Sequence, residues 1–270
     1  MGGLPSIRII DSSSASLRSA REPIMPVAIC RFMSTNNHIG GFVVRTLLHH
    51  HQRILNRAEH VLIGLSPFNG YYKPRLVRDL VAWGHHHFDR VDVFVPGWET
   101  AHTLTGAGMS PRDAVHRSRR AAKRLRNAAV DALRSCDDAE PHMRVHTSTT
   151  LANRAAYTRL HERVRTEYAH DPVIRAACRE TAREALRTHC TGQPTEQQID
   201  LAVSYPLAEL PLILDSPAIF AAESSVVVYH RELGPLTPLI LGHSPTVEPV
   251  AGQGFAVVTP PPTALERSEG

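Results

Sequence analysis

The chain has few of the features that mark several protein classes. Only four of its 270 residues are cysteines, Cys30, Cys136, Cys178 and Cys190, and no two of them form a CxxC pair. A disulfide scaffold and a four-cysteine zinc site are therefore not supported. There is no run of about 18 uninterrupted apolar residues, and no compact apolar segment follows a basic start in the first 30 residues. These absences predict an unexported protein of the cytoplasm with no membrane span.

Excess charge of one sign is also small, because 30 Lys and Arg residues face 26 Asp and Glu residues for a formal net charge of +4. Apolar residues make up 42% of the chain, which is enough for a sizeable core and excludes disorder of the whole chain. A small-polar run at residues 11–16 has little apolar content to anchor it. Residues 1–35 are predicted to be a disordered extension, residues 36–262 a single domain, and residues 263–270 a flexible tail.

Short strand-like and helical segments alternate through the middle of the chain. Residues 59–65 and 90–95 are predicted strands, and residues 74–84 between them have helical periodicity. This order predicts a parallel βαβ unit with a right-handed crossover. The predicted fold is α/β, a single Rossmann-like domain with a parallel sheet flanked by helices. Further strands are expected at 143–145 and 226–229, with helices at 152–169, at 171–189 and from 196 to 214.

A long basic helix is predicted to begin after Ser110, a hydroxyl N-cap that is followed by Pro111 and Asp113. Between residues 112 and 134 there are eight basic residues and two acidic ones, an excess of six that exceeds the charge of the whole chain. The ordinary interpretation is a solvated helix face. The functional interpretation is a surface that binds RNA phosphates with strong salt dependence and little sequence selectivity.

Ser66 directly follows the predicted strand 59–65, in the segment HVLIGLSPFNG. Ligands of parallel α/β proteins bind at the carboxyl ends of the strands, so Ser66 is a candidate nucleophile. The segment lacks the second glycine of a hydrolase nucleophile elbow. The alternative is a turn in which Ser66 and Asn69 only cap the next helix.

Two later segments carry further polar groups. Tyr205 and Glu209 are four residues apart in YPLAELP, which places them on one face if the segment is helical. Tyr229 and His230 end the predicted strand 226–229. Each segment alone is typical of core packing, so only their combination with the Ser66 segment suggests a site.

In their order and spacing, these three motifs resemble the cyclodipeptide synthases over roughly residues 36–260. The resemblance implies a Rossmann domain similar to the catalytic domain of tyrosyl- and tryptophanyl-tRNA synthetases, with two aminoacyl-tRNAs as substrates. It also implies that Ser66 accepts the first aminoacyl group in a ping-pong reaction that yields a diketopiperazine. It further implies that Tyr205 and Glu209 bind the α-ammonium group of the aminoacyl substrate. Asn69, Tyr229 and His230 match the subgroup of the family that carries Asn, Tyr and His at these positions.

No cofactor is implied, because an aminoacyl ester is already activated and the enzyme mainly has to position groups. The histidine runs at 49–51 and 85–87 do not predict a metal site, since consecutive side chains of a helix do not converge on one face.

The resemblance also assigns binding residues, and spacing from the three motifs places the side-chain pockets. Phe94 in the first pocket favours a compact apolar residue, and Glu184 in the second favours a polar or basic one. The alternative for the second pocket is that its side chains point to solvent and the site accepts many residues. Two aminoacyl-tRNAs are the expected partners, without DNA or a membrane, and the protein is expected to be a monomer. The first pocket comprises Leu62, Gly64, Phe94, Ser148, Leu212 and Val227; the second comprises Thr181, Glu184, Thr188 and His189; the tRNA contacts on helix 111–134 are Arg117, Arg119, Arg120, Lys123, Arg124 and Arg126.

Two other functions remain open at the level of sequence. An RNA-binding module without catalysis would need the basic helix but not Ser66, Tyr205 and Glu209 together. A serine hydrolase would need Ser66 with an activating histidine, and it would not need the basic helix. Which two amino acids are joined is not determined by the sequence.

Overall fold

The computed structural model describes residues 36–190 and 192–261, and for residues 36–39 it describes the backbone alone. The predicted N-terminal extension and C-terminal tail lie outside the described residues. Both therefore stay predictions.

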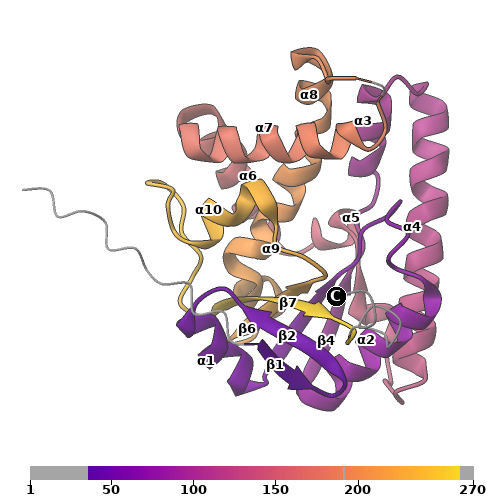
Figure 1. Ribbon diagram of the computed structural model, residues 1–270, viewed down its shortest axis with the longest axis vertical. Helices are drawn as coiled ribbons and strands as arrows, with labels where there is room; N and C mark the ends of the chain where they lie inside the picture. Colours follow the sequence, from indigo (N-terminus) through magenta and orange to yellow (C-terminus); the bar gives the residue numbers. More distant parts are fainter. Residues whose placement is uncertain (1–35, 191, 262–270) are drawn as a thin grey trace, which may run out of the picture. The chain divides into compact units, whose positions relative to one another are not determined.

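Seven strands of the described chain form one sheet (Figure 1). Across the sheet their order is first, second, seventh, sixth, third, fourth and fifth. The third to seventh strands pair in parallel, as predicted, and the first two form a hairpin that adds antiparallel to the seventh. The strands are β1 (Asn36–Ile39), β2 (Phe42–Thr46), β3 (His60–Gly64), β4 (Arg90–Phe94), β5 (Val145–His146), β6 (Ser225–Tyr229) and β7 (Gln253–Thr259).

The antiparallel hairpin was not part of the predicted sheet. Its turn is the dipeptide Gly40-Gly41, with φ of 56° and 80°. Positive φ at both central residues is what a tight two-residue hairpin turn requires, and glycine adopts it without a Cβ clash.

Helices cover both faces of the sheet (Figure 1). Val61 and Ile63 of β3 face a core formed with α1, α2 and α4, whereas Leu62 faces a core formed with α6, α7 and α9. Burial of both faces explains the nearly continuous apolar runs of the central strands. The helices are α1 (His49–Arg57), α2 (Pro74–His87), α3 (Glu99–Gly106), α4 (Pro111–Arg134), α5 (Ser148–Leu151), α6 (Ala155–His170), α7 (Pro172–Arg187), α8 (Glu196–Ala202), α9 (Ser204–Phe220) and α10 (Thr237–Ile240), with short 3-10 turns η1 (Pro141–Arg144) and η2 (Gly234–Leu236).

Two predicted elements differ from the structure. The strand expected at 143–145 is displaced, because Pro141 begins η1 and the strand β5 starts only at Val145. The helix expected from 196 to 214 is two helices that separate at Val203. Pro206 has no backbone N–H to donate to residue 202, so it interrupts the hydrogen-bond ladder there.

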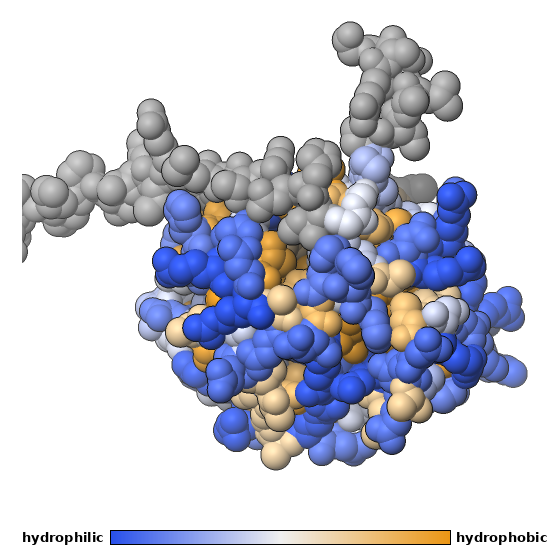
Figure 2. All heavy atoms as spheres, turned by 90° about the horizontal axis from the view of Figure 1, so that it is seen from below, coloured by the Kyte–Doolittle hydropathy of each residue, from blue (hydrophilic) through white to orange (hydrophobic). Residues whose placement is uncertain are grey.

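The described residues form no long apolar helix, and the face drawn in Figure 2 is mostly hydrophilic. No helix in the described ranges is both long and apolar enough to cross a membrane. On the face drawn in Figure 2, hydrophilic residues cover most of the described part, and apolar residues show as smaller patches between them.

Candidate active site

A cavity of about 670 Å³ opens beyond the carboxyl ends of β3, β4 and β6. Loops at these strand ends, together with α7 and α9, supply its wall. This is the edge at which α/β sheets bind ligands. All six residues predicted to be catalytic line the cavity: Ser66, Asn69, Tyr205, Glu209, Tyr229 and His230.

The Ser66 hydroxyl lies two residues beyond β3 and shares the cavity wall with the phenols of Tyr205 and Tyr229. Burial, followed by the charge of Glu209, raises the pKa of Tyr205 well above its usual value and raises that of Tyr229 to about 12. Both phenols therefore keep their protons at neutral pH. Two protonated phenols beside a serine can donate hydrogen bonds to an acyl oxygen as charge develops on it.

Glu209 lies one helical turn after Tyr205 on α9. The pKa of Glu209 is raised to about 7; burial is the largest cause, the interaction with the Tyr205 phenol opposes it, and the charge of Glu99 adds to it. A carboxyl that titrates near neutral pH can bind an α-ammonium group and can also accept a proton from it.

Asn69 and His230 connect the loop after Ser66 to the end of β6. The backbone N–H of Tyr71 donates to Asn69 Oδ1 at 3.0 Å, so the Asn69 amide nitrogen faces His230 Nε2 at 3.2 Å. Tyr72 lies on the other side of the imidazole, with its hydroxyl 2.9 Å from Nδ1. Burial lowers the pKa of His230 to about 4, so the ring is neutral at neutral pH. With both nitrogens occupied, the geometry supports a positioning role for His230 rather than proton transfer.

The sequence model of one family, cyclodipeptide synthase, matches residues 42–260, which is most of the chain. The chain belongs to the cyclodipeptide synthase family.

Relatives and solved structures agree with this assignment. The chain is 31% identical over 225 residues to the cyclo(L-tyrosyl-L-tyrosyl) synthase of Mycobacterium tuberculosis, which covers 82% of this chain and 76% of the relative. It is 29% identical over 232 residues to the cyclo(L-leucyl-L-leucyl) synthase of Bacillus subtilis, covering 84% and 92%. A solved Mycobacterium tuberculosis structure, described as showing that cyclodipeptide synthetases are related to type I tRNA synthetases, matches with a TM-score of 0.76 at 30% identity and covers 86% of this chain and 98% of that one.

The cavity of this cyclodipeptide synthase family member also contains most of the predicted pocket residues. Leu62, Gly64, Phe94, Leu212 and Val227 line it, as do Thr181, Glu184, Thr188 and His189.

Ser148 is the exception among the pocket residues, because it is not part of the cavity wall. It is the first residue of α5 and is only 6% exposed. Its Oγ lies beside Gly97 and has no hydrogen-bond partner among the described residues.

Glu99 is a further acidic group near the site, and the sequence pattern does not predict a role for it. It begins α3, is 3% exposed, and accepts a hydrogen bond from the Gly97 backbone at 2.9 Å. Burial raises the pKa of Glu99, and its charge in turn raises that of Glu209. The sequence signal that could have identified Glu99 is its position just after the carboxyl end of β4, at the sheet edge where Ser66 also lies.

The predicted basic helix is present as α4. Ser110 caps it by accepting a hydrogen bond from the Asp113 backbone at 3.2 Å. One described ion pair on its basic side joins Arg134 to Asp131, and the helix runs along one edge of the described chain (Figure 1). The eight basic side chains are all exposed: Arg112, Arg117, Arg119, Arg120, Lys123, Arg124, Arg126 and Arg134.

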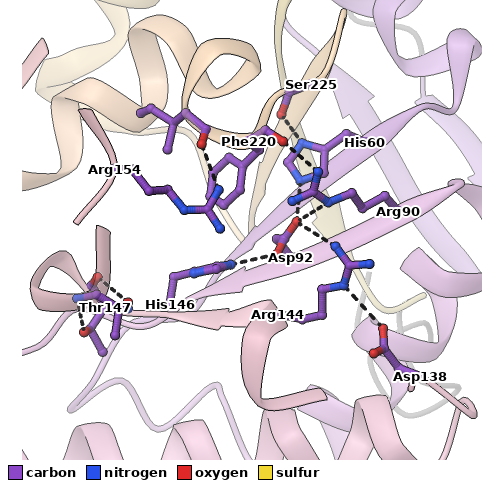
Figure 3. Close-up of polar contacts among 12 residues, drawn as sticks. His60, Arg90, Asp92, Asp138, Arg144, His146, Thr147, Arg154, Phe220 and Ser225 are labelled. Carbon is purple, nitrogen blue, oxygen red and sulfur yellow. Dashed lines mark hydrogen bonds and ion pairs between the residues drawn. The ribbon is translucent and has the colours of Figure 1, made fainter. Parts of the chain in front are cut away.

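A serine–histidine–aspartate arrangement lies in the sheet, with His60 and Ser225 at the amino ends of β3 and β6, and none of its residues lines the cavity (Figure 3). His60 places Nδ1 2.7 Å from Ser225 Oγ and Nε2 3.1 Å from Asp92, and His146 lies 2.7 Å from the other oxygen of Asp92. Ser225 has no exposed surface and does not line the cavity. No substrate can reach this hydroxyl, so the arrangement does not favour a hydrolase; it links the inner strands.

Replacing Asp92 with asparagine is expected to lower the free energy of unfolding by about 3–5 kcal/mol, because a buried charge network loses its central partner. Hydrogen bonds from His146 and His60 overcome the effect of burial and hold the pKa of Asp92 well below its usual range. Its contribution is therefore present above about pH 4, the usual carboxyl pKa, and is lost as the pH falls below that.

Chemical denaturation measures the effect, and Asp131→Asn is the control because its ion pair with Arg134 is exposed. The control is expected to change the free energy of unfolding by less than about 1 kcal/mol. Equal effects of the two substitutions would contradict a structural role for the network.

Proposed function

We propose that the protein is a tRNA-dependent cyclodipeptide synthase, which joins two aminoacyl groups from aminoacyl-tRNAs into a 2,5-diketopiperazine through an aminoacyl ester of Ser66. The observation that carries the proposal is the convergence of Ser66, the half-buried phenols of Tyr205 and Tyr229, and the Glu209 carboxyl in one cavity. The printed activities of the relatives support the same class of product.

In the first step, Ser66 Oγ attacks the ester carbon of an aminoacyl-tRNA. The bond from that carbon to the ribose oxygen breaks, the bond to Oγ forms, and the Ser66 proton ends on the released ribose hydroxyl. Tyr205 and Tyr229 stabilise the developing oxyanion or pass on the proton. Glu209 and Tyr205 hold the α-ammonium group, which fixes the orientation of the acyl group in the cavity.

In the second step, the amine of a second aminoacyl-tRNA attacks the ester carbon on Ser66; the bond from that carbon to Oγ breaks, Ser66 regains its hydroxyl proton, and a dipeptidyl-tRNA forms. Ser66 Oγ then attacks the ester carbon of the dipeptidyl-tRNA and releases the second tRNA with a free ribose hydroxyl. The free α-amine of the dipeptide finally attacks the same ester carbon, which closes the ring and releases the Ser66 hydroxyl. Each aminolysis needs a neutral amine, so one ammonium proton must leave each time. Glu209 accepts it because its pKa is about 7.

The experiment that tests this function is expression in bacteria with mass spectrometry of the culture medium. A new diketopiperazine mass that requires Ser66 supports the proposal and also identifies the two amino acids. RNA binding without such a product would indicate a binding module, and ester hydrolysis without it would indicate a hydrolase.

The α4 helix is proposed to bind the acceptor end of the tRNA. Replacing Arg119, Arg120 and Lys123 with alanine is expected to weaken tRNA binding and to reduce the slope of log affinity against log salt by about 0.9 or less per lost phosphate contact. Binding titrations at several salt concentrations measure the slope. An unchanged slope would mean that RNA docks elsewhere.

The two predicted pockets are proposed to select the amino acids. Phe94→Ala is expected to admit larger side chains at the first position, because removal of the ring opens space in the cavity wall. Glu184→Leu is expected to shift the second position toward apolar side chains. An apolar substrate side chain leaves the Glu184 carboxylate unpaired in wild type, and the substitution removes that cost. Product spectra measure both changes. Spectra unmoved by either substitution would refute the pocket assignment.

A further inference from the structure

Phe68 occupies an unusual backbone conformation beside the nucleophile. It lies two residues after Ser66, and its φ of 69° is in the left-handed region. This region is unfavourable for a residue with a Cβ atom, and such residues are frequent at functional sites. The loop thus holds an aromatic ring at this place against a local conformational preference.

The ring joins the cavity to the basic helix. Phe68 lines the cavity and also packs against a small cluster of Ala101, Leu104 and Ala114 from α3 and α4. The guanidinium carbon of Arg117, an exposed residue of α4, lies 5.6 Å from the ring centroid. The ring of His189 lies 6.0 Å from it at an interplanar angle of 89°.

Burial, followed by the nearby charge of Arg117, lowers the pKa of His189. The place combines the aromatic ring of Phe68 with one exposed cation, Arg117.

The chemistry of the proposed function brings a nucleoside to this place. When the ester carbon of an aminoacyl-tRNA reaches Ser66 Oγ, the terminal ribose is one bond away from that carbon. The preceding phosphates would lie along α4, where the exposed basic side chains are. The terminal adenosine must then cross the space between Ser66 and α4, and Phe68 lies in it.

We propose that Phe68, with Arg117, binds the 3′-terminal adenosine of the aminoacyl-tRNA. The base stacks against the Phe68 ring, and Arg117 pairs with the adjoining phosphate. Stacking of a base on an aromatic side chain is a general mode of single-strand recognition and depends little on the identity of the base. This inference rests on the proposed function, since it needs an aminoacyl-tRNA as the acyl donor.

The test compares two acyl donors for Ser66, an aminoacyl-tRNA and the dinitrobenzyl ester of the same amino acid, which has no nucleoside. With Phe68→Leu, kcat/KM for the aminoacyl-tRNA is expected to fall about 10-fold or more, chiefly through KM, within the range that loss of base stacking allows. The acylation rate with the small ester is expected to stay within about twofold of wild type on the same grounds. Leucine keeps the Cβ and hence the backbone cost, so the comparison isolates the ring.

Further variants complete the test. Phe68→Tyr is expected to keep kcat/KM for the aminoacyl-tRNA near the wild-type value, because tyrosine keeps the aromatic ring. Arg117→Ala is expected to show the same selective loss, and Arg57→Ala is the control because Arg57 is an exposed arginine of α1 that neither belongs to α4 nor lines the cavity. The trinucleotide CpCpA is expected to compete with the small ester in wild type, and to do so about 10-fold less well in Phe68→Leu.

The outcomes separate the two proposals. An equal fall for both donors in Phe68→Leu would mean that Phe68 only positions the Ser66 loop, and no fall for either would mean that it has no role; each result overturns the adenosine site. Wild-type protein that accepts the small ester but not the aminoacyl-tRNA would refute the proposed function itself. Thermal midpoints establish that each variant is folded.

Discussion

Ser66→Ala is expected to abolish both the cyclodipeptide and the covalent aminoacyl-enzyme, with a loss in rate of roughly 10³-fold or more, as for other nucleophile deletions. Without Oγ the first acyl group cannot form an ester with the protein, so the second amine has no acyl-enzyme to attack. The fold should persist, because losing one half-buried hydroxyl costs about 1 kcal/mol. Intact-protein mass spectrometry after incubation with an aminoacyl-tRNA measures the acyl-enzyme, and a thermal scan measures stability.

Ser225→Ala is the matched control for this experiment. Ser225 is hydrogen-bonded to a histidine, but it is buried at the amino end of β6 and does not line the cavity. It is expected to lower the thermal midpoint and to leave acyl-enzyme formation intact in the folded protein. Product formed at the ordinary rate by Ser66→Ala, or loss of the acyl-enzyme in folded Ser225→Ala, would contradict the covalent mechanism.

Glu209→Gln is expected to reduce product formation by about 100-fold or more, in the range of general acid–base contributions. Glutamine keeps the size of the side chain but has neither the charge that holds the α-ammonium group nor a basic oxygen. Because the pKa of Glu209 is raised to about 7, activity of the wild-type protein is expected to rise with pH up to about 7 and then level off. This limb of the pH profile should disappear in the variant.

Stability gives a second readout for Glu209 with the opposite sign. A carboxyl whose pKa is raised in the folded protein stabilises the fold at low pH, and that contribution is lost as the pH rises from about 4.5 toward 7. At pH 8, Glu209→Gln should therefore raise the thermal midpoint while activity falls. A lower midpoint with full activity would assign Glu209 a structural role. Glu196→Gln is the control, since this exposed glutamate pairs with Arg179 and does not line the cavity, so the substitution should not alter the pH profile.

Much of the fold could be predicted because its signals are local. The central strands are short apolar runs, since both faces of the sheet are buried, and Ser110 followed by Pro111 marks a helix start without reference to any other segment. The antiparallel hairpin and the break at Val203 could not be obtained in the same way. The hairpin depends on which edge of the sheet is free, and the break depends on a missing hydrogen bond four residues before Pro206.

The candidate site, like the fold, could be predicted from the sequence only in part. By itself the sequence determined the family motifs, because Ser66, Tyr205 with Glu209, and Tyr229 with His230 keep their order and spacing along the chain. Only the tertiary structure decided that Glu99 lies near enough to raise the pKa of Glu209, that Ser148 stays outside the cavity, and that Phe68 meets Arg117. The physical reason is that pKa values and ring contacts depend on distances through space, and these exist only once the sheet has brought distant segments together.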